Sequence, residues 1–168
     1  GMVPTNFASK SAGKYATRGN GGNWAGDFVR PLLLNTSIGA DKYAKIAADY
    51  YECLHAVMGE SQYYSMDPFH EGGGAGTMAD YEYMYAAMEA AKPGSQWVIQ
   101  QWQWSATQKY SLKAVPEGRL IVLDLFSDGS PAFDRYNGYV PQEAIFCAIP
   151  NFGGRSGVMG RLNNVTDN

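Results

Sequence analysis

An apolar run of strand length, with one acidic residue inside it, reads Leu120-Ile121-Val122-Leu123-Asp124-Leu125-Phe126. A strand with one face in water alternates apolar and polar residues, whereas this run is apolar on both faces. Strands of that kind belong to parallel sheets that are covered on both sides. The run therefore predicts an α/β fold in which helical crossovers join parallel strands.

Three further strands are predicted on either side of this run. They span Gln62 to Met66, Gln96 to Trp102 and Ala144 to Ile149. Residues 1–31 are rich in glycine, asparagine and aromatic residues without periodicity, which is typical of an irregular loop, and Gly1 to Pro4 are at most the stub of a fifth strand. Strand, loop, helix and strand follow one another along the chain, and no internal sequence repeat accompanies them.

The helices between the strands are predicted from apolar spacing and capping residues. The first has possible caps at Asn35-Thr36-Ser37 and a stop at Gly59. The second begins at a capping box, Thr77-Met78-Ala79-Asp80, and is broken at Lys92-Pro93-Gly94. A short polar helix follows across 105–113, before a turn at Pro116-Glu117-Gly118. The apolar face expected on the first helix consists of Tyr43, Ile46, Ala47, Tyr50, Leu54 and Val57.

Composition excludes several classes of function. The 13 Lys and Arg residues are outnumbered by 16 acidic residues and form no basic run, so a nucleic-acid-binding surface is not expected. Apolar runs are of strand length, and neither a membrane span nor a secretory signal is predicted. Two cysteines, Cys53 and Cys147, exclude a disulfide scaffold, and both are expected to be buried free thiols.

Three strands lead into polar or glycine-rich segments. Asp67-Pro68-Phe69-His70-Glu71-Gly72-Gly73 follows the first of them, Asp124 lies near the end of the next, and Asn151-Phe152-Gly153-Gly154 follows the last. Barrel enzymes keep acid catalysts at the carboxyl ends of their strands. These segments together predict one catalytic rim. On residues alone, an exposed loop glutamate without a role is the favoured interpretation of Glu71.

Four motifs in consistent order resemble the alpha-N-acetylglucosaminidases of glycoside hydrolase family 89, and most of all their bacterial branch. The motifs are residues 61–73, Gln100-Gln101-Trp102, residues 118–126 and Asn151-Phe152-Gly153-Gly154. The resemblance implies a (β/α)8 TIM barrel, of which residues 1–168 form one partial segment. About four parallel strands with crossover helices are expected, without the first and last strands of the barrel. The parent enzyme is expected to be secreted or periplasmic.

The resemblance also implies an activity and its residues. The family releases terminal non-reducing alpha-linked N-acetylglucosamine from glycans with retention of configuration, and its acid/base glutamate matches Glu71. Trp102 matches a pocket tryptophan that stacks on the sugar, while Phe146, Asn151 and His70 are expected to contact substrate at the same rim. Trp97 and Trp104 either share the face of Trp102 or bend away. The resemblance implies no metal and no cofactor.

The sequence leaves open which residue supplies the second catalytic carboxylate, the nucleophile. In an alpha-linked N-acetylglucosaminide the 2-acetamido group lies on the face of the leaving group, so the protein must supply the nucleophile. The family's nucleophile lies beyond Asn168, which predicts an inactive isolated chain. Asp67 and Asp124 are substitutes, although an acid such as Asp124 more often orients a neighbour or caps a loop. The alternatives are a non-catalytic carbohydrate-binding segment or a purely structural one. Open barrel edges predict a homo-oligomer.

Overall fold

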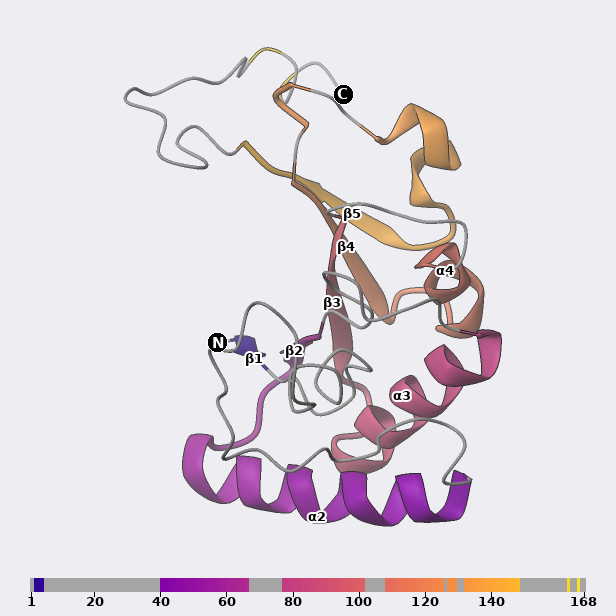
Figure 1. Ribbon diagram of the computed structural model, residues 1–168. Coiled ribbons are helices and arrows are strands. Elements are labelled where there is room, and N and C mark those ends of the chain that lie inside the picture. Colours follow the sequence, from indigo (N-terminus) through magenta and orange to yellow (C-terminus); the bar gives the residue numbers. More distant parts are fainter. Residues whose placement is uncertain are drawn as a thin grey trace, which may run out of the picture.

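The computed structural model describes residues 2–4, 40–66, 77–101, 108–125, 127–129, 132–148, 163 and 166. A five-stranded parallel sheet lies at its centre, in the order β1-β2-β3-β4-β5 (Figure 1). The strands are β1 (Met2–Pro4), β2 (Tyr63–Ser65), β3 (Gln96–Gln101), β4 (Leu120–Asp124) and β5 (Glu143–Phe146). Each strand pairs with the next one along the chain, without the reversal of order that marks a doubly wound sheet. This is the winding of a barrel wall, and the predicted α/β partial barrel is confirmed.

The described helices follow one another along one side of the sheet (Figure 1). They are α2 (Ala40–Met58), α3 (Met78–Ala91) and the short α4 (Ser111–Ala114), which continues the 3-10 turn Gln108–Tyr110. A second 3-10 segment, Asp134–Tyr139, leads from β4 to β5. The predicted polar helix is thus found as two short turns in its described part. Gly59 ends α2 with φ +77, a backbone conformation that glycine adopts without strain, and its N–H bonds to the His55 carbonyl.

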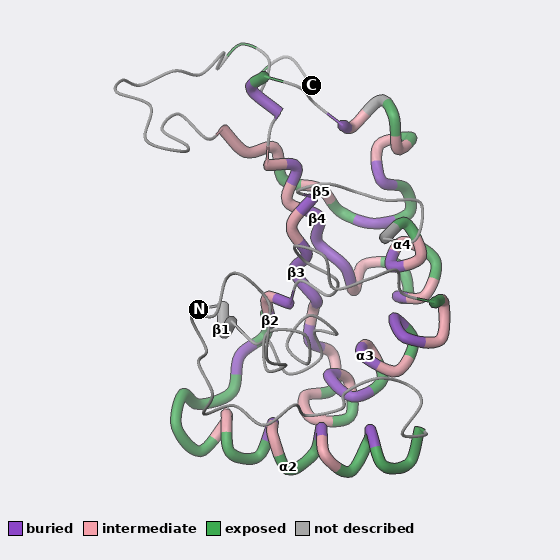
Figure 2. The backbone as a smooth tube through the Cα atoms, in the orientation of Figure 1, coloured by how far each residue is buried: buried purple, intermediate pink, exposed green. Residues whose placement is uncertain are grey.

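The core lies between the sheet and these helices. Alternate strand residues point into it, among them Tyr64, Trp97, Ile99, Leu120 and Val122. They meet Tyr43, Ala47 and Tyr51 from α2 and Tyr81, Met84 and Met88 from α3. Figure 2 shows the buried residues of α2 on the side toward α3 and the sheet, and its exposed residues on the outer side.

Two predictions about α2 were wrong. Val57, expected on its apolar face, is 84% exposed, because the final residues of α2 extend past the packed layer: Ala56 to Met58 are all exposed. Tyr51, which was not included in that face, is buried instead. Cys53, expected to be buried, is exposed, and Cys147 is half-buried. Cys53 follows Glu52 on the water-facing side of the helix, where both residues are exposed.

The capping box at the start of α3 is confirmed. The Thr77 N–H donates to Asp80 Oδ2 at 2.7 Å, and the Asp80 N–H donates to Thr77 Oγ1 at 3.3 Å. Reciprocal bonds of this kind satisfy backbone donors that the first turn of a helix leaves free. The box therefore fixes the residue at which α3 begins.

Replacing Thr77 by alanine is expected to weaken α3 locally by about 1 kcal/mol, because the side-chain acceptor of the Asp80 N–H is lost. Amide hydrogen exchange in residues 78–82 measures this loss. Thr77→Ser, which keeps the hydroxyl, is the matched control and should exchange nearly as slowly as the wild type. Equal acceleration in both variants would contradict the capping role.

Candidate functional site

The carboxyl ends of the parallel strands meet at one edge of the sheet, and polar residues lie there. Gln101 pairs in register with Asp124, and Asp124 pairs with Phe146, so the last described residues of β3, β4 and β5 form a row. Residues paired in register point to the same side of a sheet. Val122 and Leu120 share that side with Asp124 and belong to the core, so the row faces the helix layer.

Trp97 lies in the core, on the helix side of β3. Its indole Nε1–H donates to the Met66 carbonyl at 2.7 Å, and its ring stacks on Tyr81 with centroids 6.1 Å apart. Val98 and Gln100 point to the opposite side, which is the interior side of a barrel. Trp97 therefore has a structural role and does not belong to a sugar-binding face.

Asp124 is fully buried at the end of β4 and binds the segment that follows it. Its Oδ2 accepts the backbone N–H of Ala132 at 2.9 Å and the hydroxyl of Tyr139 at 3.0 Å. Its Oδ1 makes no hydrogen bond within the part of the chain that the structure describes. The expectation that this acid caps a loop and orients a neighbour is confirmed.

An aromatic cluster surrounds the hydroxyl that Asp124 binds. The Tyr139 ring stacks on Tyr136 at 5.6 Å between centroids and meets Phe133 edge-on at 6.3 Å. Phe133 in turn packs edge-on against Phe146 at 5.1 Å. Burial, followed by the charge of Asp124, raises the pKa of Tyr139, so its hydroxyl stays protonated and can donate. The same two causes raise the pKa of the Cys147 thiol.

The predicted site residues divide between described and undescribed positions. Phe146 is described, and it is half-buried against Phe133. The others, Glu71, His70, Trp102 and Asn151, lie outside the described residues. In the sequence, Trp102 comes directly after β3, and the segment with His70 and Glu71 begins directly after Met66.

Sequence reasoning missed the partners of Asp124. Tyr139 and Phe133 lie in a segment without periodicity, where Asn137, Gly138 and Tyr139 all have positive φ. No helical or strand spacing relates these residues to Asp124. A sequence signal exists in the concentration of aromatic residues between Phe133 and Tyr139, but it does not indicate which of them the carboxylate binds.

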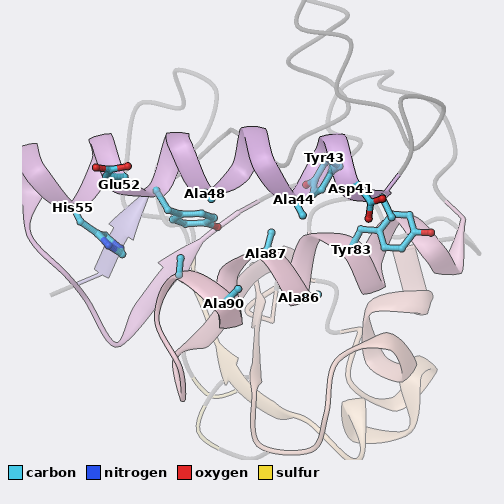
Figure 3. Close-up of a pocket in the computed structure, with 13 residues that line it drawn as sticks. Asp41, Tyr43, Ala44, Ala48, Glu52, His55, Tyr83, Ala86, Ala87 and Ala90 are labelled. Carbon is cyan, nitrogen blue, oxygen red and sulfur yellow. The ribbon is translucent and has the colours of Figure 1, made fainter.

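A groove of about 570 Å³ runs along the outer helix layer between α2 and α3 (Figure 3). Alanines form much of its wall, and Tyr43, Tyr51, Tyr83 and His55 also line it. Burial raises the pKa values of Tyr43 and Tyr51. Figure 3 shows the acidic lining residues Asp41 and Glu52 near opposite ends of α2. Their backbones are about 16 Å apart at roughly 1.5 Å per residue. A retaining pair needs carboxyl groups about 5 Å apart, so Asp41 and Glu52 do not form such a pair in this groove.

Among the residues that the structure describes, no group of three or more His, Cys, Asp and Glu side chains could hold a metal ion. The described helices include none that is long and apolar enough to cross a membrane. The edge strands β1 and β5 each pair on one side within the described sheet, and Ile145 of β5 is 51% exposed. Self-association through these edges stays a prediction.

Comparison with known proteins agrees with the arrangement of this sheet. The family described as the Alpha-N-acetylglucosaminidase (NAGLU) tim-barrel domain matches residues 1–168. The alpha-N-acetylglucosaminidase of Homo sapiens is 38% identical over 90 residues, which cover 49% of this chain and 12% of the human protein. The chain thus spans a small part of that relative's length.

Solved structures of a family 89 glycoside hydrolase from Clostridium perfringens have a similar fold. One is a variant with two glutamates replaced by glutamine, in complex with its substrate GlcNAc-alpha-1,4-galactose. Its sequence is 34% identical and the TM-score is 0.60. The match covers 70% of this chain and 14% of the Clostridium perfringens chain. Another, in complex with 2-acetamido-1,2-dideoxynojirimycin, is 31% identical with a TM-score of 0.52. The match covers 61% of this chain and 12% of that bacterial chain.

Proposed function

Since the chain belongs to the family of the alpha-N-acetylglucosaminidase TIM-barrel domain, we propose that it takes part in hydrolysing terminal non-reducing alpha-linked N-acetylglucosamine from glycans. The observation that carries this proposal is the family match over residues 1–168. The sequential parallel strand order of this chain supports it. A similar structure holds GlcNAc-alpha-1,4-galactose as its substrate, which supports this class of glycan.

Glu71 is the proposed general acid and base. Hydrolysis with retention needs a protonated acid beside the glycosidic oxygen and a second carboxylate about 5 Å away that attacks the anomeric carbon. In the first step Glu71 protonates the departing oxygen, and in the second it removes a proton from the attacking water. Its sequence position after β2, whose carboxyl end lies at the same edge as those of β3 to β5, supports this role.

Asp124 is not the proposed nucleophile. Its side chain is fully buried, points toward the helix layer, and already accepts two hydrogen bonds on Oδ2. A nucleophile must reach the anomeric carbon from the face opposite the leaving group, and a carboxylate enclosed in this way cannot. The proposed nucleophile is therefore a carboxylate other than Asp124.

The pocket residues are proposed from the family motifs. Trp102 would stack on the apolar face of the sugar ring, because an indole offers a broad flat surface to the C–H bonds of a pyranose. Asn151 and His70 would bond to sugar hydroxyls. Phe146 pairs in register with Asp124 on the helix side and packs against Phe133, so it would support the rim at the end of β5 without facing the sugar.

Incubating the natural gene product with paired aryl alpha- and beta-N-acetylglucosaminides tests this function. We expect release of N-acetylglucosamine from the alpha substrate, with the alpha anomer detected first by proton NMR before it mutarotates. The beta substrate is the matched control and should remain intact. Hydrolysis of the beta substrate alone, or first appearance of the beta anomer, would contradict the proposal.

A further inference from the structure

We propose that Asp124 is a positioning residue for the sugar pocket, which it holds in shape through Tyr139 and the aromatic cluster around it. This inference rests on the proposed function. It adds a residue that does not touch substrate but holds the chain between β4 and β5 at the carboxyl edge of the sheet.

Asp124 binds four later residues at once. Its backbone carbonyl accepts the Ser127 hydroxyl at 2.8 Å and the Cys147 N–H at 2.9 Å. Its carboxylate accepts the Ala132 N–H and the Tyr139 hydroxyl on the same oxygen. Hydrogen bonds in a buried site are electrostatically stronger than the same bonds in water. The segment between β4 and β5 is therefore fastened at both of its ends to one residue.

Tyr139 passes this constraint to β5. Its ring contacts Phe133, and Phe133 contacts Phe146, the last residue of β5. The packing around Phe133 is tight: a Cβ added to Gly138 would lie 2.9 Å from Phe133 Cζ, and Gly138 has φ +65. The position of Phe133, and with it that of Phe146, thus depends on a close backbone approach that the Tyr139 hydroxyl bond helps to maintain.

The same cluster reaches the segment after β3. Lys109 Nζ lies 4.9 Å from the centroid of the Tyr136 ring, and Tyr136 stacks on Tyr139. Gln142 Nε2 donates to the Val115 carbonyl at 2.7 Å. Residues 108–115 are therefore held against the segment between β4 and β5, and they follow Trp102 closely in the sequence. One buried carboxylate thereby links the end of β5 to residues 108–115.

The test compares two Tyr→Phe variants of the natural gene product. Tyr139→Phe removes the hydroxyl that Asp124 accepts, whereas Tyr51→Phe removes a buried hydroxyl that has no hydrogen-bond partner within the described part of the chain. The readouts are KM and kcat on an aryl alpha-N-acetylglucosaminide and the Kd of 2-acetamido-1,2-dideoxynojirimycin. We expect Tyr139→Phe to raise KM and Kd by about five- to tenfold with a smaller change in kcat, and Tyr51→Phe to change none of them more than about twofold.

A second pair of variants keeps the test independent of one substitution. Asp124→Asn retains an acceptor at the position of Oδ2 and should restore part of the affinity that Asp124→Ala loses. Faster amide exchange at residues 143–148 and 108–115 in Tyr139→Phe, but not in Tyr51→Phe, would report the loosened segments directly. Normal turnover in the wild type, with Tyr139→Phe indistinguishable from Tyr51→Phe, would overturn this inference alone. A wild type that neither turns over the substrate nor binds the inhibitor would overturn the proposed function, and the inference with it.

Discussion

Replacing Glu71 by glutamine in the natural gene product is expected to lower kcat by about 10²- to 10⁴-fold on alpha-N-acetylglucosaminides with alkyl leaving groups. Glutamine keeps the size of the side chain but cannot supply the proton that a poor leaving group needs. On substrates with strongly activated aryl leaving groups the first step needs little protonation, so the loss there should be much smaller. Steady-state kinetics on a series of leaving groups measures the difference.

Glu117→Gln provides the matched control for this series. Glu117 lies in an exposed turn before β4, and the same loss of charge there should leave kcat unchanged on every leaving group. Equal losses across the series in Glu71→Gln would remove Glu71 from the acid role. Wild-type activity in that variant would do the same.

Trp97→Ala is expected to cost about 3 to 5 kcal/mol of stability, since it removes a fully buried indole together with its hydrogen bond to Met66 and its stacking on Tyr81. The measurement is the denaturant concentration at which pulse proteolysis begins to cleave the natural gene product within residues 40–148.

Trp102→Ala is the paired variant, five residues further along the same stretch of chain. Trp102→Ala should weaken substrate affinity and lower stability much less than Trp97→Ala does, because stacking on a sugar contributes to binding and not to the core. Greater destabilisation by Trp102→Ala than by Trp97→Ala would show that the structural and sugar-binding roles of these residues had been exchanged.

The sequence was sufficient to predict the regular elements, and the reason is periodicity. The apolar run around β4 has residues suited to a strand buried on both faces, and Thr77 with Asp80 forms a capping box whose geometry depends on four consecutive residues. Such local patterns predict structure well because the interacting residues are neighbours in the chain. The parallel sheet followed from the alternation of these elements.

Predictions that depended on packing between elements were less successful. Val57 and Cys53 have residue types suited to burial, yet the ends and outer face of α2 meet no partner among the described elements that would bury them. The sequence did not show which face of its strand Trp97 lies on. The register of Trp97 with Tyr64 and Leu120 places it on the core face. The binding of Tyr139 to Asp124 joins residues across a turn with positive φ, where no periodic pattern relates them. The family motifs named Glu71 and Trp102, and these assignments stay predictions.

The role of Glu71 is tested most directly by the anomeric configuration of the sugar azide that the Glu71→Ala variant of the natural gene product forms. With an activated aryl alpha-N-acetylglucosaminide, this variant should still form the glycosyl-enzyme, but water would attack it slowly without a general base. Azide needs no base and would attack from the face that the leaving group vacated. If Glu71 is the acid and base, azide should restore turnover and form an N-acetylglucosaminyl azide of alpha configuration. A beta azide would show that Glu71 is the nucleophile and contradict its assignment as the acid and base.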